Sequence, residues 1–330
     1  MELVVKVLLG SIFLFLENFR TSSKGVIEDA LKINRMKKIG FLLVFLSIIL
    51  TGCRLDNFLF NPLTLTEYKF DAFDEEQYFV VEDSYAIQDS WIELMTLESG
   101  PEDDLETIYA AYIGDKSRIS QDTVILYCHG NAGHMDYYWE RVKLLANAGG
   151  KNRFGVLFMD YRGYGLSTGT SSEAGLYYDV DACMKWLKAQ GLTGDRLVIY
   201  GFSLGGAPST ELTATPRTLT PSKLILEAPF ASFEYMAQDI AKVSFAGSFY
   251  GDLTIDNSVE IQKIQQPFLW MHGTDDDFVG IHHGEFVQQN YQGTHKVLRR
   301  VPGGEHSTVP LVMGFEIYMK LIADFITGEI

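Results

Sequence analysis

The sequence predicts an α/β protein with a mainly parallel β-sheet and helices on both of its faces. Two observations lead to this prediction: short apolar runs recur along the chain from residue 91 onward, and helical patterns separate the later runs. Strands that are buried on both faces of a sheet appear in a sequence as nearly continuous apolar segments. Alternation of such strands with helices produces parallel strands joined by crossover helices.

Eight segments have the apolar character of buried strands. They span residues 91–97, 107–113, 123–128, 154–159, 196–200, 224–227, 268–271 and 296–301. No helical pattern lies between the first two, and we therefore expect them to form an antiparallel hairpin at one edge of the sheet. The sequence thus predicts an eight-stranded, mostly parallel sheet.

Six segments have the periodicity of helices. They span residues 137–148, 173–190, 204–214, 233–243, 284–291 and 309–325. The connection 231–266 is longer than a plain crossover, and we expect it to form a small lid of one or two helices. The domain predicted in this way covers residues 91–330, and we expect the aromatic-rich residues 53–90 to be a tether and lead-in.

The composition is that of a globular protein with an acidic body. Hydrophobic residues make up 47% of the 330 residues and charged residues 21%, so a sizeable core is available. The net charge is −16, and an acidic body repels phosphate backbones, which argues against nucleic-acid binding. The cysteines Cys53, Cys128 and Cys183 lack the spacing of a zinc site, and we expect the last two to be buried.

Residues 36–53, which read MKKIGFLLVFLSIILTGC, have the features of an export signal. Two lysines precede an apolar run, and small residues precede the cysteine. The run is about a dozen residues long, whereas a spanning helix needs about 20, so an uncleaved transmembrane anchor is the less favoured alternative. The last four residues resemble the lipobox of bacterial lipoproteins. This resemblance implies that residues 36–52 are a signal peptide and that Cys53 becomes the lipidated first residue of the mature protein.

The resemblance also implies a location in the bacterial cell envelope, with the membrane as a partner through the lipids on Cys53. Because Arg54 follows the cysteine, where an aspartate is the usual signal for the inner membrane, we expect the periplasmic face of the outer membrane if two membranes are present. Residues 1–35 hold a second apolar patch and do not fit this picture. We expect translation to start at Met36 and residues 1–35 to be an upstream extension; an additional membrane helix is the alternative.

The segment Gly201-Phe202-Ser203-Leu204-Gly205 matches the pattern G-x-S-x-G between a predicted strand and a predicted helix. A chain that reverses sharply from strand to helix needs small neighbours on both sides of the serine, and the turn exposes the hydroxyl above the sheet. The N-terminus of the following helix offers N–H groups to a developing anion. Ser203 is therefore the candidate nucleophile.

Three further motifs follow predicted strands. They are His129-Gly130-Asn131-Ala132-Gly133 after 123–128, His272-Gly273-Thr274-Asp275-Asp276-Asp277 after 268–271, and Gly303-Gly304-Glu305-His306-Ser307 after 296–301. Together with G-x-S-x-G they resemble the α/β-hydrolase superfamily over roughly residues 105–327, and most closely the abhydrolase-domain serine hydrolases with an HGN oxyanion loop. That branch includes protein depalmitoylases, whose cysteine-rich amino terminus is absent here.

The resemblance implies a catalytic triad in the chain order Ser203, Asp276, His306, with His306 as the general base. Asp276 stands where the HGTxD form of the loop carries its acid, and the adjacent Asp275 and Asp277 are the alternatives. The backbone N–H groups of Asn131 and Leu204 are the implied oxyanion donors, with Ala132 as the alternative to the first.

Two motif residues outside this set are expected to be structural. His129 stands on the wrong side of the nucleophile in chain order to be the base, and we expect it to brace its loop. Asp160-Tyr161-Arg162-Gly163-Tyr164-Gly165 matches a D-x-R-G-x-G turn common in the same superfamily.

The function implied is hydrolysis of an ester or thioester bond in a small or lipid-like acyl substrate through an acyl-enzyme, without metal or organic cofactor. A serine peptidase or amidase of the same fold is one alternative. A non-catalytic envelope lipoprotein is another, but the sequence retains every residue of the triad.

Overall fold

The computed structural model describes residues 59–75, 77–241 and 252–330. The expected signal peptide, the upstream extension and Cys53 lie outside the described residues, as do residues 242–251 of the expected lid. In the described part of the chain, no helix is both long enough and apolar enough to cross a membrane.

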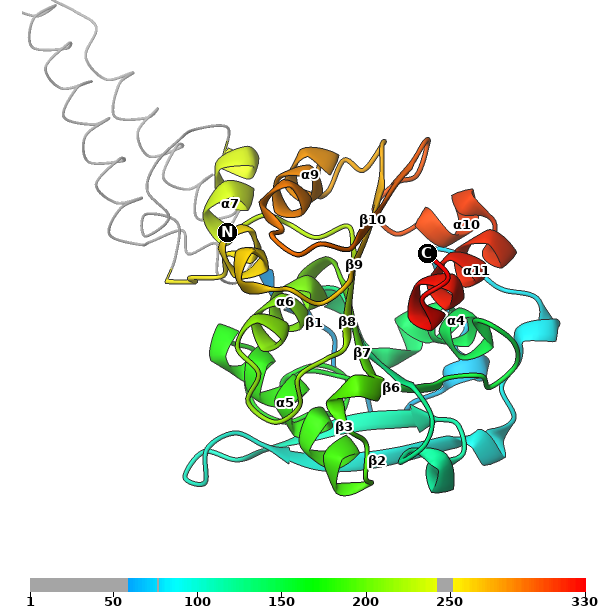
Figure 1. The fold of residues 1–330 in the computed structure, drawn as a ribbon. Coiled ribbons are helices and arrows are strands. Elements are labelled where there is room, and N and C mark those ends of the chain that lie inside the picture. Colours follow the sequence, from blue (N-terminus) through cyan, green and yellow to red (C-terminus); the bar gives the residue numbers. More distant parts are fainter. Residues whose placement is uncertain (1–58, 76, 242–251) are drawn as a thin grey trace, which may run out of the picture. The chain divides into compact units, whose positions relative to one another are not determined.

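Eight strands form the central sheet in the order β10-β9-β8-β7-β4-β6-β3-β2 (Figure 1). Their bounds are β2 (Ile92–Ser99), β3 (Glu106–Ile113), β4 (Val124–Cys128), β6 (Gly155–Met159), β7 (Leu197–Phe202), β8 (Lys223–Glu227), β9 (Phe268–Gly273) and β10 (Lys296–Val301). Strands from β10 to β6 pair in parallel, whereas β3 pairs antiparallel with both β6 and β2. The predicted mostly parallel sheet and its edge hairpin are confirmed.

Helices cover both faces of the sheet (Figure 1). Their bounds are α4 (Met135–Asn147), α5 (Glu173–Ala189), α6 (Gly206–Ala214), α7 (Phe233–Ala241), α8 (Asn257–Glu260), α9 (Ile281–Asn290), α10 (Val309–Met313) and α11 (Phe315–Thr327). The apolar residues of α4 and α11 pack on one face, and those of α5, α6 and α9 pack on the other. Cys128 at the end of β4 and Cys183 on α5 are both fully buried in this second core, as expected.

Two element boundaries differ from the prediction for local backbone reasons. The single helix expected over 309–325 is two helices, because Gly314 between them has a φ of 83°, which a helix cannot contain. The strand expected to end at Tyr200 continues to Phe202, so β7 runs directly into the turn that carries Ser203.

From residue 59 onward, the expected lead-in packs on the domain instead of hanging free. Its short strand β1 (Asn61–Pro62) pairs in parallel with β5 (Ala132–Gly133), which belongs to the loop after β4. Farther along, the ring of Phe70 lies 4.7 Å from that of Trp139 on α4. This segment therefore supports the loop that the sequence assigns to the oxyanion hole.

Candidate active site

Ser203 lies at a sharp turn between β7 and α6, and it has a φ of 51°. This left-handed conformation is strained for a residue with a side chain. Steric crowding requires glycine on both sides of the serine. A Cβ on Gly205 would lie 2.0 Å from the carbonyl oxygen of Cys128, and a Cβ on Gly201 would lie 2.5 Å from the carbonyl oxygen of Gly205. The strand and the helix can approach this closely only because neither glycine has a side chain.

The structure brings Ser203, His306 and Asp276 into one hydrogen-bonded chain. The Nε2 atom of His306 lies 2.9 Å from Ser203 Oγ, and its Nδ1 atom lies 2.8 Å from Asp276 Oδ2. Since an ionised carboxylate only accepts hydrogen bonds, Nδ1 carries the proton and Nε2 is left to accept the hydroxyl of the serine. This arrangement has the geometry of a nucleophile, a base and an acid that orients the base.

Asp276 is held as an anion by the groups around it. Burial acts to raise its pKa, but hydrogen bonds from His272 and His306 outweigh burial and hold the pKa below its usual value. Its Oδ1 atom accepts the N–H groups of Phe278 and Val279 at 3.1 and 2.8 Å. Sequence reasoning gave His272 no role, although the residue stands in the same motif as the acid.

The two neighbouring aspartates occupy different surroundings. Asp275 is exposed and accepts a hydrogen bond from the hydroxyl of Thr274 at 2.8 Å. Asp277 is also exposed and lines the pocket beside Ser203. Asp276 is thus the aspartate of this run that the structure places against His306.

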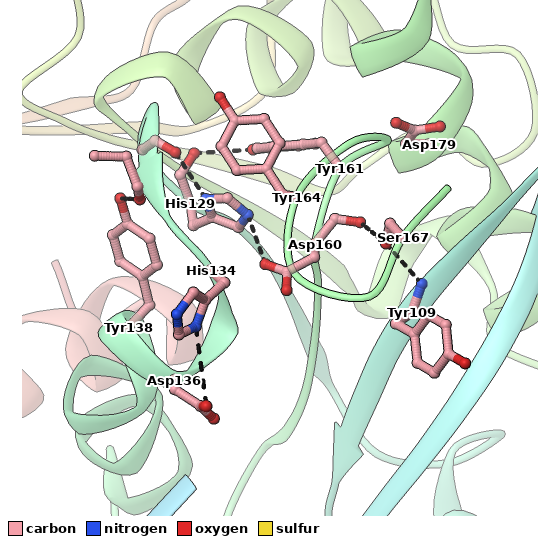
Figure 2. Close-up of polar contacts among 12 residues, drawn as sticks. Tyr109, His129, His134, Asp136, Tyr138, Asp160, Tyr161, Tyr164, Ser167 and Asp179 are labelled. Carbon is pink, nitrogen blue, oxygen red and sulfur yellow. Dashed lines mark hydrogen bonds and ion pairs between the residues drawn. The ribbon is translucent and has the colours of Figure 1, made fainter. Parts of the chain in front are cut away.

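The two residues expected to supply oxyanion N–H groups come from the loop after β4 and from the turn that carries the nucleophile. Leu204 follows Ser203 in the first turn leading into α6, and its side chain is buried. Asn131 and Ala132 line the same pocket as Ser203. His129, expected to brace this loop, is fully buried and lies with its Nε2 atom 3.3 Å from Asp160 Oδ1 (Figure 2).

A cavity of about 560 Å³ opens beside the serine. Its lining combines the rings of Tyr78, Tyr138, Phe202 and Phe278 with polar residues, among them the carboxylates Asp277 and Glu305. The described residues that line it include no lysine or arginine. Such a cavity suits a largely apolar group with neutral or positive neighbours.

The comparisons with known proteins agree with this architecture. A family model described as the alpha/beta hydrolase fold matches residues 123–247. An esterase from Pyrococcus furiosus superposes with a TM-score of 0.58 over 82% of this chain and 98% of its own, at 18% sequence identity. The chain has the α/β-hydrolase fold.

Proteins similar in sequence come from animals and bacteria. The chain is 29% identical over 210 residues to the alpha/beta hydrolase domain-containing protein 17B of Xenopus tropicalis, covering 62% of this chain and 67% of that protein. It is 35% identical over 182 residues to the mouse lysophosphatidylserine lipase ABHD12, covering 50% of this chain and 44% of the lipase. The match therefore spans less than half the length of the lipase.

Behind the candidate active site lies a buried ion pair that sequence reasoning missed. The guanidinium of Arg141 on α4 lies 2.6 Å from Glu227 at the end of β8, and it donates to the carbonyl oxygen of Ser307 at 3.1 Å. It also lies 4.5 Å from the centre of the Phe202 ring. Arg141 thus touches the residue before the nucleophile and the residue after the base.

Two tyrosine hydroxyls complete this buried group. Tyr318 donates to Glu227 at 3.0 Å, and Tyr200 also hydrogen-bonds to the same carboxylate. The signal in the sequence was a single glutamate that ends an otherwise apolar strand, since a charge there requires a buried partner.

One group of three potential metal ligands occurs within the described ranges: Asp239, His282 and His283. The Nδ1 atom of His283 accepts the N–H of Ala231 at 3.2 Å, so its Nε2 atom carries the proton and donates to Asp239. Burial and the neighbouring His282 lower the pKa of His283 to about 4, which keeps the ring neutral. A protonated nitrogen cannot coordinate a metal. We therefore interpret the three residues as a hydrogen-bonded contact that joins α7 to α9, not as a metal site.

Proposed function

We propose that this protein is a serine hydrolase that cleaves ester or thioester bonds, with Ser203 as the nucleophile, His306 as the general base and Asp276 as the orienting acid. The observation that carries the proposal is the hydrogen-bonded chain from Ser203 Oγ through both nitrogens of His306 to Asp276. The strained backbone of Ser203 supports it, because strain of this kind persists where a side chain must be held in a particular direction.

The reaction follows from these contacts. His306 Nε2 takes the hydroxyl proton while Ser203 Oγ attacks the acyl carbon, and Asp276 stabilises the imidazolium that forms. The backbone N–H groups of Asn131 and Leu204 hold the oxyanion, and one such donor typically contributes about 3 kcal/mol. The imidazolium then protonates the leaving alcohol or thiol. A water molecule, deprotonated by His306, attacks the acyl-enzyme and releases the acid.

The substrate we propose is an uncharged acyl ester or thioester with a lipid-like acyl group. The aromatic rings that line the cavity support an apolar acyl group, and Asp277 and Glu305 in its lining disfavour anionic groups near the bond that is cleaved. An esterase and a lipase are among the proteins similar to this chain, which agrees with acyl ester substrates.

Replacement of the nucleophile tests the proposal. We expect Ser203→Ala to remove turnover of p-nitrophenyl butyrate, by about 10⁶-fold on the precedent of a serine protease, and to abolish labelling by a fluorophosphonate probe. Ser222→Ala is the matched control, because the hydroxyl of Ser222 bonds Leu197 at the opposite end of β7. Full activity in Ser203→Ala would overturn the mechanism. Parallel assays with peptide amides separate an esterase from a peptidase.

We also propose that Cys53 is lipidated and anchors the mature protein to the bacterial envelope. Two or more acyl chains on one cysteine hold a protein stably on a membrane, whereas a single short chain does so only marginally. Radiolabelled palmitate should enter the wild-type protein and not Cys53→Ser, and the variant should leave the membrane fraction with unchanged esterase activity. Mass spectrometry that finds residues 36–52 still attached to an unmodified Cys53 would contradict the proposal.

A further inference from the structure

Two tyrosines of the D-x-R-G-x-G turn reach the loop 129–133. The hydroxyl of Tyr161 donates to the carbonyl oxygen of His129 at 2.9 Å (Figure 2). The hydroxyl of Tyr164 donates to the carbonyl oxygen of Asn131, also at 2.9 Å. The turn after β6 therefore holds two alternate peptide groups of the predicted oxyanion loop.

The carbonyl oxygens of Gly130 and Ala132 in this loop are also bound by side chains. His129 donates through Nδ1 to the carbonyl oxygen of Gly130 at 2.7 Å, and Tyr138 on α4 donates to that of Ala132 at 2.8 Å (Figure 2). Four consecutive carbonyl oxygens thus each accept a hydrogen bond from a side chain. The loop has no exposed residue, so its carbonyl groups need hydrogen-bond partners, and side chains supply one to each of these four.

The restraint on the carbonyls fixes the direction of the N–H groups. In a planar trans peptide the C=O and N–H bonds point in opposite directions. Holding the Gly130 carbonyl therefore orients the N–H of Asn131, and holding the Asn131 carbonyl orients the N–H of Ala132. For each peptide group that could donate to the oxyanion, a hydrogen bond to its carbonyl oxygen prevents the group from rotating.

The groups that hold the loop are themselves fixed and stay protonated. Tyr161 and Tyr164 are fully buried and Tyr138 is 5% exposed. Burial raises the pKa of all three phenols, so their hydroxyls remain hydrogen-bond donors at any pH at which the protein works. Their rings surround His129, with centroids 4.4 to 5.5 Å from that of the imidazole.

We propose that Tyr138, Tyr161 and Tyr164 are positioning residues of the oxyanion hole. Tyr164 holds the peptide group that carries the N–H of Ala132, whereas Tyr138 and Tyr161 pack against His129, which holds the peptide group that carries the N–H of Asn131. This inference rests on the proposed hydrolase function. It also gives the D-x-R-G-x-G turn a function in the reaction, because the motif supplies two of the three hydroxyls.

Removal of one hydroxyl at a time tests the inference. We expect Tyr161→Phe and Tyr164→Phe each to lower kcat for p-nitrophenyl butyrate about tenfold with KM unchanged, the population shift that loss of one hydrogen bond produces. The double variant should lose about a hundredfold, close to the effect of deleting one oxyanion donor. The inhibition constant of a trifluoromethyl ketone, which forms a tetrahedral oxyanion on the serine, should rise by the same factors.

Tyr291→Phe is the matched control. Its hydroxyl also donates to backbone carbonyls, those of Gln266 and His295, and its side chain is similarly buried, but it lies beyond α9 and away from the pocket. We expect kcat and the inhibition constant of this variant to equal those of the wild type. If Tyr161→Phe or Tyr164→Phe does not fold, Tyr138→Phe carries the same test.

Folded tyrosine variants whose kcat and inhibition constant stay within twofold of the wild type would overturn the inference. A rise in KM with kcat unchanged would also overturn it, because the tyrosines would then act on substrate binding. A wild-type protein without turnover dependent on Ser203 would instead refute the proposed function itself, so the two failures are distinguishable.

Discussion

Two loops meet at Ser203, and different chemistry restrains each of them. On one side, the loop 129–133 is held by direct hydrogen bonds from uncharged tyrosine hydroxyls and a histidine N–H. On the other side, the loop that carries His306 is held by Arg141, whose charge is balanced by Glu227. The first loop only has to keep its shape during the proposed reaction, whereas the second carries a group that gains and loses a proton.

The two loops differ in whether a charged group binds their backbone. Buried ions are costly to desolvate, and hydroxyls hold a backbone without that cost. Asp276, which is ionised and hydrogen-bonded by two histidines, also lies on the base side, where a positive imidazolium forms. A charged group therefore contacts the loop of the base directly, whereas on the oxyanion side hydroxyls and an N–H bind the backbone and the carboxylate of Asp160 lies behind the imidazole of His129.

Neutralising the acid should have the largest effect, because the base side depends on charge. We expect Asp276→Asn to lower kcat by about 10⁴-fold, the loss known for the equivalent change in a serine protease, since an amide favours the wrong tautomer of His306. Esterase kinetics measure this directly. Asp275→Asn and Asp277→Asn are the controls and should stay within a few-fold of wild type. A larger loss of kcat in either control would show that the neighbouring aspartate, not Asp276, is the acid that orients His306.

Breaking the buried ion pair should have the next largest effect, and it should be an effect on stability. Arg141→Met leaves Glu227 buried without its counter-ion, and we expect the free energy of unfolding to fall by about 3–5 kcal/mol. Urea denaturation measures the loss. Arg300→Met, which breaks the half-exposed pair of Arg300 with Glu285, should cost less than about 1 kcal/mol. If both variants lose the same free energy of unfolding, the pair of Arg141 with Glu227 contributes no more to stability than a surface ion pair.

The smallest effect should appear in the pH dependence and should separate the two sides. Glu227→Gln leaves the Arg141 charge uncompensated, and because Arg141 contacts the residue after His306, this charge disfavours a second positive charge in the same loop. The acid limb of the kcat/KM profile should therefore move to lower pH, by about one unit. Tyr164→Phe changes no charge and should lower the profile without moving it. A limb that moves in Tyr164→Phe but not in Glu227→Gln would reverse the contrast.

The sequence was sufficient to predict the fold and to name residues that the structure brings together. Ser203, Asp276 and His306 each follow a strand of the sheet, and the carboxyl ends of parallel strands meet at one edge. The place of each residue after a predicted strand was therefore enough to predict that the three lie close together. The same reasoning found the loop 129–133.

Other features depend on contacts that no local pattern encodes. Arg141 and Glu227 are 86 residues apart, and their pairing depends on which face of α4 meets the end of β8. Strand β1 is two residues long and has no periodicity to detect. The tyrosines of the turn after β6 were visible as a motif, but the acceptors of their hydroxyls could be identified only in three dimensions.

The two buried cysteines give the protein an internal reporter of unfolding. Burial raises the pKa of the Cys128 thiol to about 12 and that of Cys183 well above its usual value, so neither is a thiolate in the closed domain. The thiolate is the form that reacts with alkylating reagents, so modification requires the core to open first. Because Cys128 lies at the end of β4, against Gly205 of the nucleophile turn, the rate at which iodoacetamide modifies it measures how often that turn separates from the sheet.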